Sequence, residues 1–195
     1  NDLLPERFGR KRSYALGKTS GKANIVKNLQ ELGLTLNDEE LKKVTQRIIE
    51  LGDKKQKVTT HDLPYIISDV LDSASEDQHV VIKSYVLTHA KGLQTSTTVS
   101  LEIDGEVIEE NASGDGQYDA FINALRKIYK KKGKELPRLT DYAVHIPPGS
   151  NSDALCETSI TWLHENKEFI TRGLDSDQTV SAIKATEKML NSIVL

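Results

Sequence analysis

Hydrophobic residues in the first third of the chain recur at the three- and four-residue spacing of amphipathic helices. This spacing predicts one helix over residues 22–32 and a second helix that Asn37 or Asp38 caps. A third helix is predicted to follow a cap at Thr59 or Thr60. The apolar stripe of the second helix consists of Leu41, Val44, Ile48 and Leu51.

The periodicity changes after the polar segment 72–79, which we interpret as a domain boundary. Beyond it, hydrophobic and polar residues alternate, as they do in half-buried strands. Asp104-Gly105 is a two-residue hairpin signal between two of these strands. Helical spacing returns over residues 117–130 and 177–193. The predicted strands cover residues 80–89, 95–103, 106–110, 139–146, 156–164 and 167–171.

One segment of this second region occurs twice. Residues 96–128 align with residues 157–189 without a gap, at a constant offset of 61 (178 − 117). Gln117 then meets Gln178, and each copy is predicted to contain strands, a polar turn and a helix. The pattern predicts an α+β fold in which a small helical subdomain precedes a domain of two pseudo-symmetric βββα units.

These patterns divide the chain into three parts. Residues 1–21 are polar and are predicted to form a linker arm, residues 22–75 a helical linker subdomain, and residues 76–195 the domain of two units. Since the chain begins at Asn1 with a polar segment, we expect it to be a piece of a longer protein.

The composition is that of an ordinary folded protein. The chain has 195 residues, of which 37% are hydrophobic and 28% charged, and its net charge is −3. No apolar run approaches the ~20 residues that span a bilayer. The single Cys156 excludes an internal disulfide and predicts a reducing, cytoplasmic location. The slightly negative charge argues against nucleic acid as the main partner.

Three motifs suggest chemistry that their spacing does not support. A phosphate-binding loop at residues 17–22 would need a glycine at the position of Arg12 or Leu16. Residues 130–134 carry four lysines, which suit the C-terminal end of a helix. The five histidines and Cys156 show no metal-ligand spacing, so the sequence predicts no metal site.

The turn Gly114-Asp115-Gly116 is the best candidate for a binding site. Glycines let the backbone approach a ligand closely, and the N–H groups at the start of the following helix favour an anion. The alternative interpretation is an ordinary turn between a strand and a helix. The second copy has Asp175 and Asp177 at the equivalent turn, and their carboxylates would repel an anion. Only the first copy is therefore expected to bind one.

Several spaced segments resemble the 2-isopropylmalate synthase family. Tyr14–Asn24 resembles the "LGKHSGKA" segment that follows the catalytic barrel, and Asp104–Phe121 resembles the "GDGPVDA" signature of the C-terminal regulatory domain. Asp141-Tyr142, residues 149–155 and residues 173–182 are similar to later segments of that domain. Thr19 replaces the usual His of the segment after the barrel, and Gln117 replaces the usual Pro of the regulatory signature.

The resemblance implies a linker and an allosteric regulatory (dimerisation) domain without the catalytic barrel. Enzymes of this family are acyltransferases that condense acetyl-coenzyme A with a 2-oxo acid in a barrel that holds a divalent metal. The best-known member catalyses the first committed step of leucine synthesis. The implied chain is inactive alone, contains no cofactor, forms a homodimer and binds leucine for feedback inhibition.

Matching the family's ligand contacts to this sequence implies nine allosteric amino-acid-binding residues and no catalytic one. The glycines and the helix start would hold a carboxylate, an aspartate the ammonium, and the apolar residues the side chain. Two alternatives remain open: a citramalate synthase that senses isoleucine, and a non-enzymatic dimerisation or nucleic-acid-binding module. The nine residues are Gly114, Gly116, Tyr118, Asp119, Leu139, Tyr142, Ile146, Asp153 and Leu155.

Overall fold

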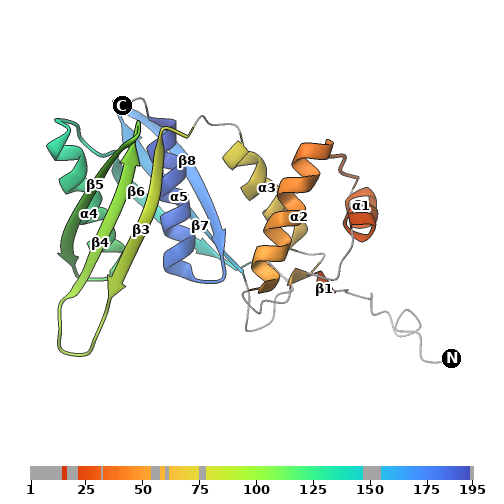
Figure 1. The fold of residues 1–195 in the computed structure, drawn as a ribbon, viewed down its shortest axis with the longest axis horizontal. Coiled ribbons are helices and arrows are strands. Elements are labelled where there is room, and N and C mark those ends of the chain that lie inside the picture. Colours follow the sequence, from red (N-terminus) through yellow and green to blue (C-terminus); the bar gives the residue numbers. More distant parts are fainter. Residues whose placement is uncertain are drawn as a thin grey trace. The chain divides into compact units, whose positions relative to one another are not determined.

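The computed structural model forms two compact units, which are described separately (Figure 1). The first unit comprises Asn1–Asp72 with Ile146–Leu155, and the second comprises Ser73–His145 with Cys156–Leu195. The structure describes residues 15–16, 22–31, 33–53, 58–59, 62–74, 78–146 and 155–193.

The first unit contains three helices and a short strand pair. The helices are α1 (Lys22–Glu31), α2 (Asp38–Asp53) and α3 (Leu63–Ala74), and β1 (Ala15–Leu16) pairs with β2 (Val58–Thr59). The stripe predicted for α2 is buried along its whole length, as the helical spacing requires. Its core residues are Ile25, Leu29, Leu41, Val44, Ile48, Leu51, Val58, Leu63, Ile66 and Ile67.

The predicted helix caps of this unit have different outcomes. Asn37 caps α2, because the Glu40 N–H donates to Asn37 Oδ1 while the Asn37 N–H donates to Glu40 Oε2, each at 2.9 Å. Of the two caps predicted for the third helix, Thr59 is wrong, and Thr60 lies outside the described residues. Thr59 lies in β2, and its N–H and hydroxyl donate to Asp62 Oδ2 at 2.7 and 2.9 Å, so α3 begins only after Asp62.

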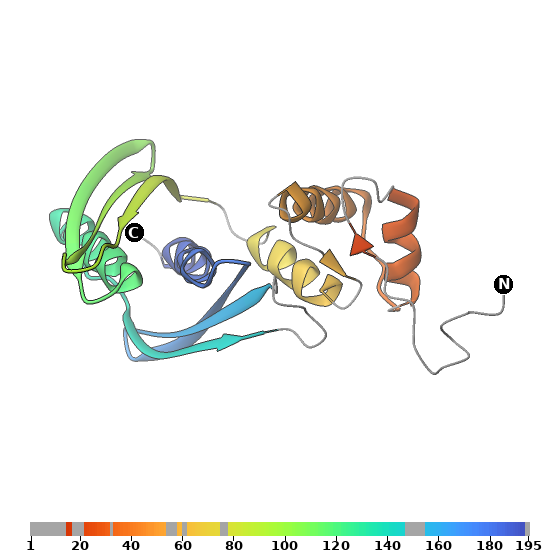
Figure 2. The same cartoon turned by 90° about the horizontal axis from the view of Figure 1, so that it is seen from below.

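The second unit consists of two βββα units, which confirms the predicted fold class. The first is β3 (Val80–Thr88), β4 (Thr95–Ile103), β5 (Glu106–Gly114) and α4 (Gln117–Lys131). The second is β6 (Arg138–His145), β7 (Cys156–His164), β8 (Lys167–Asp175) and α5 (Gln178–Ser192). Each sheet is antiparallel with its strands in sequence order, and Figure 2 shows α4 and α5 between the two sheets.

The repeat is preserved in the boundaries of the elements. β4, β5 and α4 coincide with β7, β8 and α5 after the same shift of 61 residues (178 − 117). The first strands follow with a shift of 57 (142 − 85), since Tyr85 pairs with Val99 as Tyr142 pairs with Ile160. Both first strands also have a bulge at the equivalent place, one before Ser84 and one before Asp141. The two units are therefore copies in register as well as in order.

Two strands extend further than predicted. The strand predicted over 106–110 continues as β5 to Gly114, and the strand predicted over 167–171 continues as β8 to Asp175. The added residues stay paired with the central strand, because Thr95 faces Gly114 and Cys156 faces Asp175. Backbone pairing continues here through residues too polar to show an alternating hydrophobic pattern.

One core joins both sheets and both helices of this unit. Trp162, Tyr129 and Phe121 are its largest fully buried side chains. The Trp162 Nε1–H donates to Thr171 Oγ1 at 2.8 Å, so the buried indole keeps a hydrogen-bond partner, and its predicted place in the core is confirmed. Among the described residues, no helix is long and apolar enough to cross a membrane.

Candidate functional site at the start of helix α4

The two glycines before α4 have different surroundings. Gly114 ends β5 and is buried, and a Cβ built on it would lie 2.4 Å from the backbone nitrogen of Ala120. A side chain there would push α4 away from its strand. A Cβ on Gly116 would meet no atom within 4 Å. Gly114 thus permits close packing of the helix, whereas Gly116 faces open space.

The start of α4 lacks a side-chain cap within the described part of the chain. Its N-cap residue is Gly116, which has no side chain to accept from the N–H groups of the first turn. The equivalent residue of α5 is Asp177, whose carboxylate accepts from the N–H groups of Thr179 and Val180 at 2.8 and 3.0 Å. This confirms that the second copy caps its own helix with a carboxylate. The helix dipole at α4 is left to attract a different anion.

A second carboxylate reinforces this difference at α5. Asp175 is buried, accepts from the Asp177 N–H at 3.2 Å, and pairs with Lys184 at 2.6 Å. Gly114 occupies the equivalent position in the first copy, since the shift is 61 (175 − 114). The first copy therefore has neither of the two carboxylates that surround the start of α5.

Asp119 lies in the first turn of α4 and is exposed. Its Oδ2 accepts from the Asp115 N–H at 3.0 Å and from Asn123 Nδ2 at 3.4 Å. These bonds hold the carboxylate over the turn that precedes the helix. In that position it can accept from an ammonium group near the helix start.

Tyr118 connects α4 to the second βββα unit. Its ring centroid lies 5.5 Å from that of Tyr142 on β6 and 6.3 Å from that of Phe121. Its hydroxyl lies 2.8 Å from the Thr186 hydroxyl on α5. Burial raises the pKa of Tyr118, so the phenol stays protonated across the physiological range.

The two site residues predicted on β6 lie on the face of the sheet that points toward the helices. Leu139 pairs with Trp162 and Tyr142 pairs with Ile160, and both partly buried side chains pack against the shared core. The structure therefore brings Tyr118 and Tyr142 together and places Leu139 on the same face as Tyr142. Of the two, Tyr142 supplies apolar surface beside Tyr118 in the first turn of α4.

The remaining three predicted residues are not joined to this group by the structure. Ile146 is 60% exposed and Leu155 is 3% exposed, and both fall in the first compact unit. Asp153 lies outside the described residues.

The other motifs have structural roles where the structure describes them. Lys131 pairs with Glu110 and Lys132 pairs with Glu106, which anchors the end of α4 to β5. His89 Nδ1 lies 3.0 Å from Thr95 Oγ1. Within the described ranges, no group of three His, Cys, Asp or Glu side chains could hold a metal ion. Residues 17–21 of the phosphate-loop motif lie outside the described part.

The structure adds residues that sequence reasoning missed. Thr186 on α5 forms a hydrogen bond with the Tyr118 hydroxyl, and Gln117 Oε1 on α4 accepts from Thr179 Oγ1 on α5 at 3.3 Å. Thr179 is the repeat equivalent of Tyr118, with the shift of 61 (179 − 118).

Comparison with known families agrees with this architecture. Residues 57–194 match the model of the LeuA allosteric (dimerisation) domain. Residues 2–56 match a model described as homocitrate synthase post-HMGL domain-like. Together the two models cover nearly the whole chain, in the order that the resemblance implies.

Individual relatives are similar along the whole chain. A putative (R)-citramalate synthase of Archaeoglobus fulgidus is 33% identical over 191 residues, which are 98% of this chain and 38% of the relative. A 2-isopropylmalate synthase of Bradyrhizobium diazoefficiens is 30% identical over 194 residues, covering 99% and 36%. A 2-isopropylmalate synthase of Methanocaldococcus jannaschii is 29% identical over 197 residues, covering 98% and 37%.

The chain thus spans less than two fifths of the length of these relatives. The family match covers more than half of the chain and includes both βββα units. It confirms the resemblance seen in the glycine turn, and the match over residues 2–56 covers the segment Tyr14–Asn24. The chain belongs to the family of the LeuA allosteric (dimerisation) domain.

Proposed function

We propose that this chain is the regulatory part of a 2-isopropylmalate synthase and that it binds leucine, the end product, for feedback inhibition. The observation that carries this proposal is the contrast between the two helix starts. α5 is capped by the Asp177 carboxylate, whereas α4 begins at Gly116, which has no side chain. At α5 the Asp177 carboxylate accepts hydrogen bonds from N–H groups of the first turn. At α4 the carboxylate of a ligand can accept from the equivalent N–H groups.

The surroundings of α4 supply the other groups that an amino acid needs. Asp119 is exposed beside the helix start and can accept from the ligand ammonium. Tyr118, Leu139 and Tyr142 offer partly buried surface for an apolar side chain. The family resemblance adds three more residues: we propose that Ile146 and Leu155 extend this apolar surface and that Asp153 is an alternative acceptor for the ligand ammonium.

The identity of the effector depends on the pocket. The relatives include both 2-isopropylmalate and citramalate synthases, so a domain that senses isoleucine is the second candidate. Leucine and isoleucine differ only in the branching of the side chain. Even one extra or missing methylene in an apolar site changes the binding free energy by only ~1–3 kcal/mol, so a change of branching alone gives weak discrimination. Direct comparison of the two ligands is therefore the deciding measurement.

We also propose that the chain acts as a homodimer through the domain of residues 76–195. The family description names dimerisation. Two large apolar side chains, Val86 and Val107, are 62% and 57% exposed. Val86 pairs with Thr98 and Val107 pairs with Glu102. These two partners alternate along β4 with Val99 and Leu101, which are buried. Val86 and Val107 therefore lie on the face of the first sheet that points away from α4. This sheet face can be covered by a second copy.

The remainder of the protein would carry the chemistry. By family resemblance, it is a barrel that condenses acetyl-coenzyme A with 2-oxoisovalerate and holds a divalent metal, in the cytoplasm. The present chain would contribute no catalytic residue and no cofactor ligand. A nucleic-acid-binding role is disfavoured because Lys131 and Lys132 are paired with glutamates.

The proposal is tested by calorimetric titration of the chain with leucine, isoleucine, valine and lysine. Leucine should bind most tightly. Sedimentation at ~100 µM should show a dimer, because this concentration is well above the dissociation constant of a specific interface. Tighter binding of isoleucine would favour the citramalate synthase alternative. Binding of neither branched-chain ligand, or a monomer with and without leucine, would contradict the proposal.

A further inference from the structure

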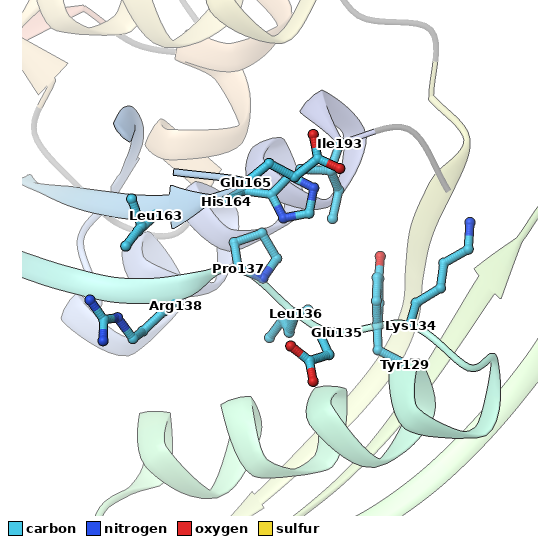
Figure 3. Close-up of a pocket in the computed structure, with 10 residues that line it drawn as sticks. All are labelled: Tyr129, Lys134, Glu135, Leu136, Pro137, Arg138, Leu163, His164, Glu165 and Ile193. Atoms are coloured by element: carbon cyan, nitrogen blue, oxygen red, sulfur yellow. The ribbon is translucent and has the colours of Figure 1, made fainter. Parts of the chain in front are cut away.

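A pocket lies at the C-terminal end of α4, within the second compact unit. It has a volume of about 450 Å³ and is formed by the end of α4, the segment that leads into β6, and the hairpin of β7 and β8 (Figure 3). Pockets that bind small molecules have volumes of roughly 300–1,000 Å³. The lining residues are Tyr129, Lys134, Glu135, Leu136, Pro137, Arg138, Leu163, His164, Glu165 and Ile193.

The turn after α4 shapes this pocket. Gly133 adopts a φ of +71°, and the Lys134 N–H donates to the Tyr129 carbonyl at 3.0 Å, which closes the helix and reverses the chain. Residues 134–137 then run back beside the last turn, with Pro137 buried. The ring of Tyr129 forms part of the wall that results, as Figure 3 shows.

The Tyr129 hydroxyl indicates a ligand. The side chain is 1% exposed, and within the described residues its hydroxyl has no hydrogen-bond partner. A buried hydroxyl without a partner costs free energy. The repeat equivalent of Tyr129 is Leu190 (190 − 129 = 61), which is fully buried and needs no partner. An apolar side chain therefore suits the equivalent place in the fold, and the hydroxyl has no evident structural role.

Charged groups of both signs line the same pocket. Lys134 and Arg138 are cationic and Glu135 and Glu165 are anionic, and all four are exposed. The described residues provide none of them with an ion pair, although Lys131 and Lys132 just before them are both paired. Apolar surface between the charges comes from Leu136, Pro137, Leu163 and Ile193.

We propose that this pocket is a second ligand site, which binds a small zwitterionic α-amino acid. The ligand carboxylate accepts from the Tyr129 hydroxyl and pairs with Lys134 or Arg138, while its ammonium group donates to Glu135 or Glu165. Since burial raises the pKa of Tyr129, the hydroxyl keeps its proton and can donate to a carboxylate. This site is distinct from the one at the start of α4 and does not depend on it.

The test is an NMR titration of the whole 195-residue chain. Leucine, isoleucine, valine, lysine and glutamate are added singly up to about 10 mM, which detects millimolar dissociation constants. At least one should shift the amide signals of Lys134, Arg138 and His164. The deaminated analogue 4-methylpentanoate and the decarboxylated analogue 3-methylbutylamine should each shift them less than leucine does, if leucine is the amino acid bound.

Matched variants separate this site from general effects. Tyr129→Phe keeps the ring and loses no recorded hydrogen bond, so it should stay folded and bind the amino acid about tenfold more weakly. Lys134→Ala should weaken binding as well. Lys130→Ala is the control, because Lys130 is exposed near the end of the same helix but does not line the pocket, and it should bind like the parent.

Two outcomes would overturn the proposal. One is that no probe shifts the pocket amides, as expected if the Tyr129 hydroxyl meets only water. The other is that folded Tyr129→Phe and Lys134→Ala bind as tightly as the parent does. Titration of Gly116→Asp distinguishes the two sites: shifts that persist at the pocket in this variant support the second site, even if leucine still binds elsewhere and the site at α4 fails.

Discussion

The hydroxyl groups of Tyr118 and Thr186 lie 2.8 Å apart and link helix α4 to helix α5. Thr186 also donates its only hydroxyl proton to the Ala182 carbonyl at 2.8 Å. Tyr118 must therefore be the donor in the contact between the two helices. Tyr118, in the first turn of α4, is thus held by a residue of the opposite copy of the repeat.

Tyr118→Phe should lower the free energy of unfolding by about 0.5–1.5 kcal/mol, the net value of one hydrogen bond. The loss stays modest because Thr186 keeps its bond to Ala182. Urea denaturation measures the effect. Tyr142→Phe is the control, since no hydrogen bond of its hydroxyl is recorded in the described residues, and it should change stability by less than ~0.5 kcal/mol. Equal effects of both variants would contradict this assignment.

Gly114→Ala should destabilise the domain by about 1–3 kcal/mol, the usual cost of overpacking. The added methyl group would lie 2.4 Å from Ala120 N and 2.8 Å from Ala120 Cα, and these backbone atoms cannot move without the helix. Thermal or urea unfolding provides the measurement. Gly116→Ser should be neutral or slightly stabilising, since its Cβ meets open space and its hydroxyl can cap α4. A Gly114→Ala protein as stable as the parent would show that α4 does not pack this closely on β5.

The stability of the domain should depend on pH through Glu187. Burial raises the pKa of this carboxyl above its ordinary value of 4.5, against the opposing effect of the bond from the Ile82 N–H. The protonated form is therefore favoured in the folded state. Stability should fall as the pH rises from about 4.5 through the raised pKa of the folded protein, where Glu187 becomes charged.

Glu187→Gln removes this titration and keeps an acceptor for the Ile82 N–H. Relative to the parent, the variant should gain stability as the pH rises through that range, and the gain should then level off. Urea unfolding at a series of pH values measures the difference. Curves for parent and variant that stay parallel from acid to neutral pH would exclude Glu187 as the source of the dependence.

The chain alone should release no coenzyme A from acetyl-coenzyme A with any 2-oxo acid. The reason is that the described residues contain neither a metal-binding cluster nor a residue to which the family resemblance assigns catalysis. A thiol-specific colour reaction measures the release, with the buried Cys156 allowed for by a blank without substrate. Turnover above this blank would overturn the regulatory assignment.

The pseudo-symmetric architecture could be predicted from the sequence because each level of pattern agreed. Alternation indicated the strands, Asp104-Gly105 indicated a hairpin, and the shift of 61 residues (178 − 117) between Gln117 and Gln178 survives in the structure. Asp104 has a φ of +50° and Gly105 of +84°, as the tight turn requires. These signals are local, so one sequence suffices to show them.

Features that depend on tertiary contacts could not be predicted from the sequence. The ends of β5 and β8 depend on pairing with β4 and β7, which polar residues such as Ser113 do not indicate. The bond from Thr59 to Asp62 displaces the expected cap of α3. The contact of Tyr118 with Thr186 joins residues 68 apart, and only the packing of two helices creates it.

The candidate sites likewise have features that the sequence predicts and features that only tertiary contacts determine. The glycine turn and the acidic capping of the second copy were readable from residue type alone, because their effect is local to a helix start. The surroundings of the unpartnered Tyr129 hydroxyl were not readable. Its position in the core is clear only when the end of α4 and the hairpin of β7 and β8 are placed together.

The most direct test of the account is leucine titration of Gly116→Asp beside the parent and Asp177→Gly. Gly116→Asp should fold, because a Cβ at this position meets open space and the φ of −139° suits any residue. Its carboxylate would lie near the ligand carboxylate, and at a separation of ~4 Å like charges near a protein surface repel by about 4 kcal/mol. Micromolar binding would then weaken to the millimolar range.

Asp177→Gly removes the cap of α5 and leaves the start of α4 unchanged. Circular dichroism should show all three proteins folded, and calorimetry should give the parent and Asp177→Gly nearly equal affinities for leucine. The account predicts that binding is abolished at micromolar concentrations only in Gly116→Asp. A folded Gly116→Asp protein that binds leucine as tightly as the parent does would contradict the central claim and place the effector site elsewhere.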